Sequence, residues 1–301
     1  MGEVLFSTTE VAKMLQVDKS TVKRWTDENK LKCFRTPGGH RKFRAEDLYN
    51  FMAEYNYGVS TLRMIPQMAS DEAIIKRIVV NKEYNVLHSV CFGAAIKGKK
   101  DDIITLFAEV SRAGLSLPHI FDFILKPTLK KMNDTLRANK ISVIENHLAL
   151  NALSGAIVQL TDSITRLSKN DKTIICASLE HERNDIEFKA LTTLLEIDGY
   201  SVLTLGVGMS AEIINELIGK VKPFAVCLHT VESADEKNLI AESEKVLMAA
   251  QKYSTQCVVG GKAYCEGSFH DMFPAIRMCK SFAEYELIQY GNSDIKIHFD
   301  K

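Results

Sequence analysis

The apolar residues of the chain repeat with three different patterns along its 301 positions. In residues 1–56, short stretches with helical spacing stand beside stretches that alternate apolar and polar side chains. Between residues 71 and 168 only the i, i+3, i+4 spacing of helices recurs, and from residue 169 onward strand-like apolar runs alternate with helical stretches. These changes predict an N-terminal domain at 1–56, a linker at 57–70, a helical bundle at 71–168 and an α/β domain at 169–301.

The N-terminal domain has the pattern of a helix-turn-helix followed by a hairpin. Ser7 and Glu10 stand at the spacing of a capping box before a first short helix, and Asp18 is placed to cap a second helix. The Pro and Gly residues of the stretch 36–40 suit a hairpin turn. We therefore expect a winged helix-turn-helix, with a second helix at 19–28, strands at 32–35 and 41–43, and a closing helix at 45–55.

The sequence patterns of residues 71–168 and 169–301 predict different architectures. Helical spacing without strand signals, broken by short polar or Gly-containing connections, predicts a four-helix bundle with helices at residues 81–96, 100–112, 118–137 and 142–167. Strands that alternate with helices predict βαβ units and a doubly wound parallel sheet. Its expected strands lie at 173–177, 201–205, 224–228 and 257–260, and its helices at 185–198, 211–221, 235–253 and 281–289.

Composition narrows the class of protein. Lys and Arg together number 38, as do Asp and Glu, so the formal net charge is zero, and hydrophobic residues make up 46%. No stretch approaches the roughly 20 apolar residues that span a bilayer, and the first residues lack a signal-peptide pattern, so we expect a cytoplasmic protein without a membrane partner. The seven cysteines are scattered and never form a CxxC pair, which is typical of buried thiols in a reducing compartment.

Neutrality of the whole chain conceals a basic segment. From Asn29 to Arg44 there are six Lys or Arg residues and His40, with no acidic residue. A basic hairpin beside a helix-turn-helix favours double-stranded DNA as the partner, because phosphate contacts need cations and the second helix offers outward polar groups opposite Val22 and Trp25. The expected DNA-binding residues are Lys19, Ser20, Thr21, Lys23, Arg24, Arg35, His40, Arg41 and Lys42.

At these residues the chain resembles a known family. The N-terminal domain is similar to the winged-helix domain of MerR-type regulators, and the motifs that carry the similarity are Thr9–Ala12, Ser20–Trp25 and Thr36–Phe43. The long dimerisation helix that usually follows in simple MerR proteins is absent here, because residues 57–66 have the pattern of a linker.

The rest of the chain resembles the cobalamin-binding unit of B12-dependent proteins, so that the whole chain is similar to B12-based light-responsive repressors. The similarity rests on the 115–127 region, the run Ser142–His147, Leu194 with Glu196, Asp198–Tyr200, Leu205–Gly206 and Gly260–Gly261. The resemblance implies a cobalamin-binding-like Rossmann domain and a ligand cleft between it and the bundle.

The residues that would hold cobalamin depart from the family pattern. Base-off cobalamin proteins carry Asp/Glu-x-His-x-x-Gly after the first strand, but here the axial His falls on Asn184 and the Gly on Glu187. An amide is a poor nitrogen donor to cobalt, and a Glu side chain crowds the space that the Gly leaves for the nucleotide tail. Two further histidines bear on this site: His229 replaces a Ser after the third strand, and His181 is a candidate replacement metal ligand.

In the bundle, the resemblance implies a Trp and a Glu-His pair above the corrin. These positions are Leu136, Asn146 and His147 in this chain, so only the His is kept. The expected ligand-binding residues are therefore Leu136, Asn146, His147, His181, Asn184, His229, Gly260 and Gly261. Structural interpretations stay open for several of them. Asn184 and Glu187 have the spacing of a helix-capping box, and His147 suits a hydrogen-bonded core histidine.

Together these patterns predict a transcriptional repressor and not an enzyme. Its sensor is expected to bind another planar tetrapyrrole, haem or a bilin, in place of His-ligated adenosylcobalamin, and to assemble a homo-oligomer, a dimer or tetramer, that controls DNA binding. Three alternatives remain: a ligand-free sensor controlled by protein–protein contact, a cobalamin photoreceptor with altered ligation, and a corrinoid protein of methyl transfer. The last needs the missing cobalt ligand and has no use for a DNA-binding domain.

Overall fold

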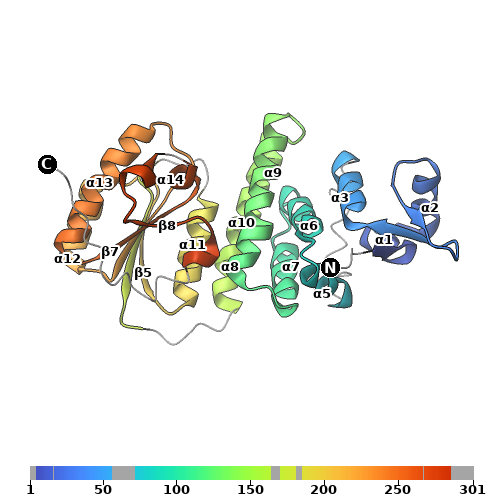
Figure 1. The fold of residues 1–301 in the computed structure, drawn as a ribbon, viewed down its shortest axis with the longest axis horizontal. Coiled ribbons are helices and arrows are strands. Elements are labelled where there is room, and N and C mark those ends of the chain that lie inside the picture. The colour runs from blue at the N-terminus through green and yellow to red at the C-terminus, as the bar shows by residue number, and fades with distance from the viewer. Residues whose placement is uncertain are drawn as a thin grey trace. The chain divides into compact units, whose positions relative to one another are not determined.

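A computed structural model describes residues 5–15, 17–55, 72–163, 170–180, 185–266 and 268–285. The chain divides into two compact units, Met1–Gln159 and Leu160–Lys301, and each is described by itself (Figure 1). Among the predicted features, the whole linker at 57–70, the loop residues His181 and Asn184, and the ends of the helices expected at 142–167 and 281–289 lie outside the described residues. No helix of the described part is long and apolar enough to cross a membrane.

The N-terminal part of the first unit is a winged helix. Its elements are β1 (Leu5–Ser7), α1 (Thr8–Leu15), α2 (Lys19–Asp27), β2 (Phe34–Arg35), β3 (Arg41–Arg44) and α3 (Ala45–Glu54). The three strands form an antiparallel sheet in the order β1-β3-β2. Strand β1 was not expected, because its three residues have no pattern of their own. It is held by β3, where Phe6 pairs with Phe43 and both side chains are fully buried.

The helix caps and the hairpin turn that the sequence predicts are present in the winged helix. The Ser7 amide donates to the Glu10 carboxylate at 2.7 Å and the Glu10 amide to Ser7 Oγ at 3.3 Å, which is a capping box for α1. Asp18 accepts from the Ser20 amide and caps α2. The hairpin turn closes with the Thr36 amide donating to the His40 carbonyl, and Gly39 takes the positive φ of 77° that a residue without Cβ adopts freely.

The helical part of the first unit contains more segments than the four expected. Its elements are α5 (Glu72–Val80), α6 (Tyr84–Ile96), α7 (Lys100–Arg112), α8 (Leu117–Ile120), η2 (Phe121–Leu125), α9 (Lys126–Arg137) and α10 (Val143–Ser163). Helix α5 was missed as a separate element. The helix expected at 118–137 contains the π-helical turn η2 just before Pro127, because the proline ring clashes with the carbonyl four residues earlier and donates no hydrogen bond to it.

The winged helix packs directly against these helices. Arg77 of α5 donates to Glu10 at 3.0 Å, so the carboxylate that caps α1 also binds a side chain of the helical part. The Arg77 guanidinium lies 5.1 Å from the centre of the Phe6 ring, and α3 packs against α6. The reader domain is therefore part of one compact unit with the helices that follow it.

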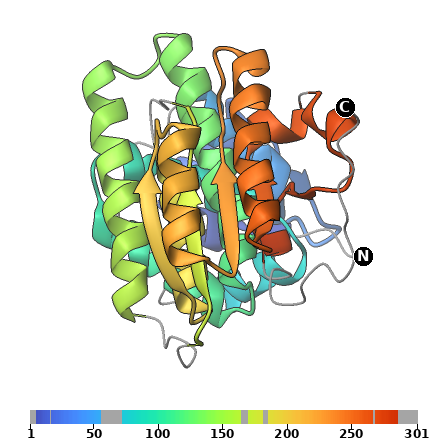
Figure 2. The ribbon, with the colours of Figure 1, turned by 90° about the vertical axis from the view of Figure 1, so that its left-hand side faces the viewer.

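The second unit is a doubly wound parallel sheet, as expected, with one more strand than predicted. Its strands are β4 (Thr173–Ala177), β5 (Ser201–Gly206), β6 (Ala225–His229), β7 (Gln256–Gly260) and β8 (Arg277–Cys279), and its helices are α11 (Ile186–Ile197), α12 (Ala211–Val221), α13 (Glu236–Lys252), α14 (Lys262–Glu266), α15 (Phe269–Met272) and α16 (Phe282–Tyr285). All neighbours in the order β5-β4-β6-β7-β8 run parallel (Figure 2). Helices α12 and α13 lie on one side of the sheet and α11 on the other (Figure 1).

The order of the strands fixes where a ligand of such a sheet is expected. The chain moves from β4 to one side for β5 and then to the other side for β6, so the switch point lies between β4 and β6 at their carboxyl ends. The short strand β8 extends the sheet beyond β7, and its three residues carry too weak a pattern to be recognised in the sequence.

Candidate functional site

The second helix of the helix-turn-helix presents its polar side chains outward. Val22 and Trp25 are buried, with the Trp25 ring 5.0 Å from that of Phe51 in α3. On the rest of α2 the expected DNA-binding residues are accessible: Lys19, Ser20, Lys23 and Arg24 are exposed, and Thr21 is half-buried. This arrangement leaves one polar face of α2 available to enter a groove.

The hairpin between β2 and β3 brings the remaining expected DNA-binding residues next to α2. Arg35 and His40 are exposed and Lys42 is half-buried. Arg41 differs, because its side chain is only 15% exposed and its guanidinium donates to Asp27 at the end of α2 at 2.5 Å. The ion pair ties the hairpin to the second helix, which makes Arg41 a positioning residue within the domain.

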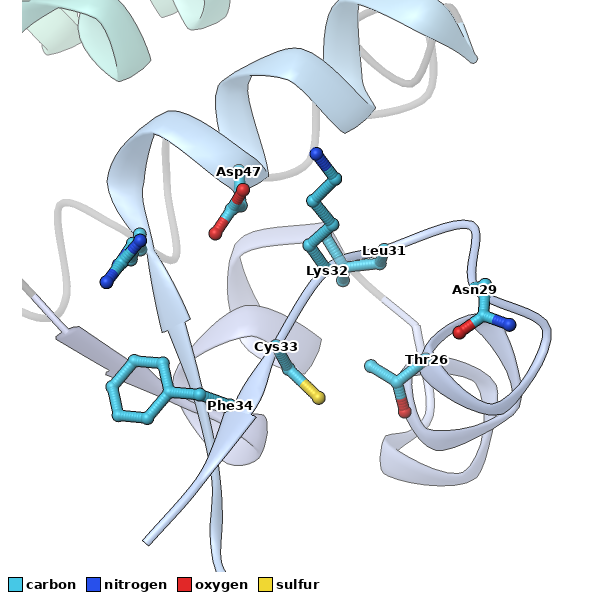
Figure 3. A pocket seen from close by; sticks show the side chains of 8 residues that line it. Thr26, Asn29, Leu31, Lys32, Cys33, Phe34 and Asp47 are labelled. Atoms are coloured by element: carbon cyan, nitrogen blue, oxygen red, sulfur yellow. The ribbon is translucent and has the colours of Figure 1, made fainter.

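A surface pocket of about 550 Å³ lies between the end of α2, β2 and the start of α3 (Figure 3). Figure 3 shows Thr26 and Asn29 on one side of the opening and Cys33 and Phe34 on the strand side. The pocket is lined by Thr26, Asn29, Leu31, Lys32, Cys33, Phe34, Arg44 and Asp47. None of the expected DNA-binding or ligand-binding residues lines it, and no sequence pattern indicated it.

In the helical part, the expected ligand residues lie on α9 and α10. Leu136 and Asn146 are half-buried, and Asn146 Oδ1 is a buried oxygen without a hydrogen-bond partner among the described residues. His147 is exposed, which contradicts its interpretation as a core histidine. Its neighbours Ile144 and Leu148 are also exposed, so this end of α10 presents an apolar surface with one imidazole.

Sequence reasoning missed a buried polar cluster between α6 and α9. Lys131 Nζ donates to Ser89 Oγ at 3.3 Å and lies 4.8 Å from the centre of the Phe92 ring. Burial lowers the pKa of Lys131 to about 8, and burial together with the Lys131 charge lowers the pKa of His88 to about 4. A lysine on an amphipathic helix is ordinarily exposed, so no pattern in the sequence marks this one.

This cluster predicts a pH dependence of stability. His88 binds a proton in the unfolded chain below its ordinary pKa of 6.5 but in the folded protein only below about 4. The unfolded state therefore binds more protons between these values, and the free energy of unfolding should rise by up to about 3 kcal/mol as the pH rises from 4 to 6.5. Urea unfolding at several pH values measures it. A His88→Gln variant should lose this part of the slope, whereas His270→Gln, which changes an exposed side chain of α15, should keep it.

At the carboxyl end of β6, His229 is enclosed by its own chain. The side chain is 1% exposed, and its Nδ1 shares a hydrogen bond of 3.0 Å with the hydroxyl of Tyr285 in α16. Burial raises the pKa of Tyr285, so the phenol stays protonated. The other ring nitrogen, Nε2, is buried without a hydrogen-bond partner among the described residues, and a carboxylate oxygen of Glu187 in α11 lies 3.8 Å from it. Glu187, which stands where the family has a Gly, and His229, which stands where it has a Ser, thus face each other.

The two glycines after β7 are both tightly covered. A Cβ on Gly260 would lie 1.8 Å from the Tyr285 hydroxyl, and a Cβ on Gly261 would lie 2.2 Å from the Thr230 carbonyl oxygen. At the switch point itself, Ser178 Oγ and Thr230 Oγ1 share a hydrogen bond of 3.1 Å, and both residues are buried. These two hydroxyls are therefore partnered within the chain, whereas His229 Nε2 is a buried nitrogen without a hydrogen-bond partner among the described residues.

These contacts test the fit of the cobalamin that the resemblance implies. The resemblance places the nucleotide tail in the space that a Gly leaves open, but Glu187 stands at that position beside His229, and the Tyr285 hydroxyl covers Gly260. The described residues of the second unit do not fit a cobalamin inserted in this way. His181 and Asn184, the other expected ligand residues, lie outside the described residues, so the capping-box interpretation of Asn184 stays a prediction.

Comparisons with known proteins agree with both parts of the architecture. Residues 5–55 match the family model described as a helix-turn-helix domain. No curated protein matches the chain. Among solved structures, the monomethylamine corrinoid protein of Methanosarcina barkeri has a TM-score of 0.54 at 20% identity, covering 67% of this chain and 96% of that one.

Two further solved structures have lower scores. The first is a cobalamin-binding protein from Desulfitobacterium hafniense DCB-2, with a TM-score of 0.35 at 17% identity, covering 68% of this chain and 97% of that one. The second is the methanol:cobalamin methyltransferase complex MtaBC from Methanosarcina barkeri, with a TM-score of 0.36 at 19% identity, covering 69% of this chain and 81% of that one. The chain thus combines an N-terminal helix-turn-helix DNA-binding domain with the fold of a cobalamin-binding, Rossmann-like domain.

Proposed function

We propose that the protein is a sequence-specific transcriptional regulator of MerR type that acts as a repressor on double-stranded DNA. The observation that supports this best is the winged helix of residues 5–55, in which α2 exposes Lys23 and Arg24 while the ion pair between Arg41 and Asp27 holds the basic hairpin beside it. A helix for the major groove and a basic wing for phosphates or an adjacent groove make up a DNA reader.

DNase footprinting of the full chain on its own promoter tests this function. We expect a protected site with two related half-sites, because one small reader makes few base contacts. Binding that is equally tight on unrelated duplexes at physiological salt would contradict sequence-specific regulation.

For the sensor, the enclosure of His229 favours control by protein–protein contact over a ligand whose tail enters the second unit. A haem or bilin, the ligand that the sequence led us to expect, is the second candidate. It would be held by His147 and its apolar neighbours, because a neutral imidazole serves as a metal ligand or as a hydrogen-bond partner of a pyrrole or propionate. The methyl-transfer protein needs a cobalt ligand that Asn184 does not supply, and a cobalamin photoreceptor with altered ligation would need another residue, such as His181, in its place.

Titration of the purified full chain with adenosylcobalamin, haem and biliverdin, followed by visible spectroscopy, separates these candidates. We expect no shift of the cobalamin spectrum. Binding of haem or biliverdin that is lost in His147→Ala but kept in His119→Ala would support the tetrapyrrole sensor. Absence of binding by all three supports the ligand-free sensor, and a cobalamin shift lost in His181→Ala would show that His181 supplies the axial nitrogen.

A further inference from the structure

We propose that the carboxyl ends of β6 and β7 form a binding site for a segment of this same chain. We call it the strand-end site and define it by Glu187, His229 and Gly260. Its occupant is the helix α16, whose Phe282 and Tyr285 fill the space that the cobalamin fold otherwise offers to a ligand. The inference concerns the second unit alone and holds whether or not the proposed DNA-binding function is right.

Helix α16 contacts His229 through two aromatic side chains. Phe282 and Tyr285 are both buried, and their rings lie 6.1 Å and 6.2 Å from the imidazole of His229, with Phe282 stacked on it. The Tyr285 hydroxyl adds the 3.0 Å hydrogen bond to Nδ1. Two aromatic rings and one hydrogen bond on a single buried imidazole hold this short helix in place.

Gly260 is the floor of the site. A Cβ there would lie 1.8 Å from the Tyr285 hydroxyl oxygen, 2.8 Å from its ring carbon Cζ and 3.0 Å from the Cys279 carbonyl oxygen. The missing side chain thus gives room to the phenol. Gly261 is a glycine for a different reason: its φ is +89°, and the atoms nearest to its Cβ position all belong to the Thr230 backbone. The Gly-Gly pair, which the resemblance connects with a ligand, is accounted for here by the chain's own packing.

The residues that depart from the cobalamin pattern are the ones that meet at this site. Glu187 replaces a Gly, His229 replaces a Ser, and the two face each other at 3.8 Å. His229 in turn holds Tyr285. The departures therefore form one connected set, in which the Glu187 carboxylate lies 3.8 Å from Nε2 of the imidazole and Nδ1 shares a hydrogen bond with the Tyr285 phenol.

Thermal unfolding of full-chain variants tests the packing. Gly260→Ala should lower the Tm by roughly 5 °C in the wild-type chain, because the new methyl group collides with the phenol. In a Tyr285→Ala background the same substitution should cost clearly less. Gly261→Ala is the matched control, since its clash is with backbone and its cost should be the same in both backgrounds. Tyr253→Ala, at a tyrosine that lies beside Gly219 and is not among the atoms nearest to Gly260, should leave the cost of Gly260→Ala unchanged.

Equal costs of Gly260→Ala with and without Tyr285 would overturn the proposal. If a glycine variant does not fold, hydrogen exchange of the wild-type chain decides instead. Slow exchange of the Ala283–Tyr285 amides, comparable with that of β7, is expected for a docked segment, and exchange at the rate of an unfolded peptide would refute it. A failed footprint of the promoter alongside intact coupling would reject the proposed function while leaving this inference standing.

Discussion

Replacing Arg35, His40 and Lys42 together by alanine should weaken binding to all DNA sequences by about 100-fold at 0.1 M salt. Two full charges are lost, each phosphate contact contributes about 0.9 to the slope of log K against log salt, and the slope should therefore fall by about two units. The structure supports this choice of residues because Arg35 and His40 are exposed and Lys42 is half-buried. Band shifts at several salt concentrations, on the promoter and on an unrelated duplex, measure both quantities.

The matched control removes the same number of positive charges from the second unit. The control is the double variant Lys220→Ala and Lys262→Ala, which changes two exposed side chains, one in α12 and one in α14. It should leave the slope of log K against log salt unchanged. If the control and the wing variant weakened binding equally, the effect would come from total charge, and the assignment of the hairpin as the DNA interface would be wrong.

Arg41 should behave differently from its neighbours in the hairpin. Its guanidinium already binds the Asp27 carboxylate, so Arg41→Ala removes little free charge and should change the salt slope by less than about one unit. It should still lower affinity, because the hairpin loses its attachment to α2. Asp27→Asn should lower affinity in the same way. An increase in affinity with Asp27→Asn would show instead that the carboxylate competes with DNA for Arg41.

Removing the second unit should lower operator affinity by at least about 100-fold, because linking two readers on adjacent half-sites raises avidity by 10²–10⁴. The fragment to compare with the full chain is residues 1–163, which ends with α10. A shorter fragment is unsuitable because Arg77 of α5 binds Glu10 and α3 packs against α6. The result would support our proposal that the sensor assembles the dimer or tetramer.

Analytical ultracentrifugation gives the oligomeric state of both chains. Fusion of a dimeric coiled coil to the fragment is the control, and it should restore most of the lost affinity if linkage is the cause. A fragment that footprints the operator as tightly as the full chain, or a full chain that is monomeric on DNA, would contradict assembly by the sensor.

The sequence by itself determined the features whose signals are local. The capping pairs of α1 and α2, the Gly39 turn and the parallel strands β4 to β7 all formed where the pattern predicted them, because each depends on residues a few positions apart or on a long apolar run. The outward polar face of α2 followed from the same periodicity. The order of the three parts along the chain was likewise visible in the change from one repeat to another.

Elements without a local signal were decided by their neighbours in space. Strands β1 and β8 are three residues long and exist because β3 and β7 pair with them. The π-helical turn before Pro127 was not predicted either, although the proline was in the sequence: a proline inside a helical pattern does not by itself show how the helix accommodates it.

The character of the candidate sites was decided by tertiary structure alone. Sequence spacing could mark Arg41 and His229 as chemically capable, but it could not show that Asp27 binds the first or that Tyr285 and Glu187 enclose the second. These partners stand 14 to 56 positions away along the chain. A hydrogen bond or an ion pair depends on distances of a few ångströms, and only the folded chain brings such distant residues to them.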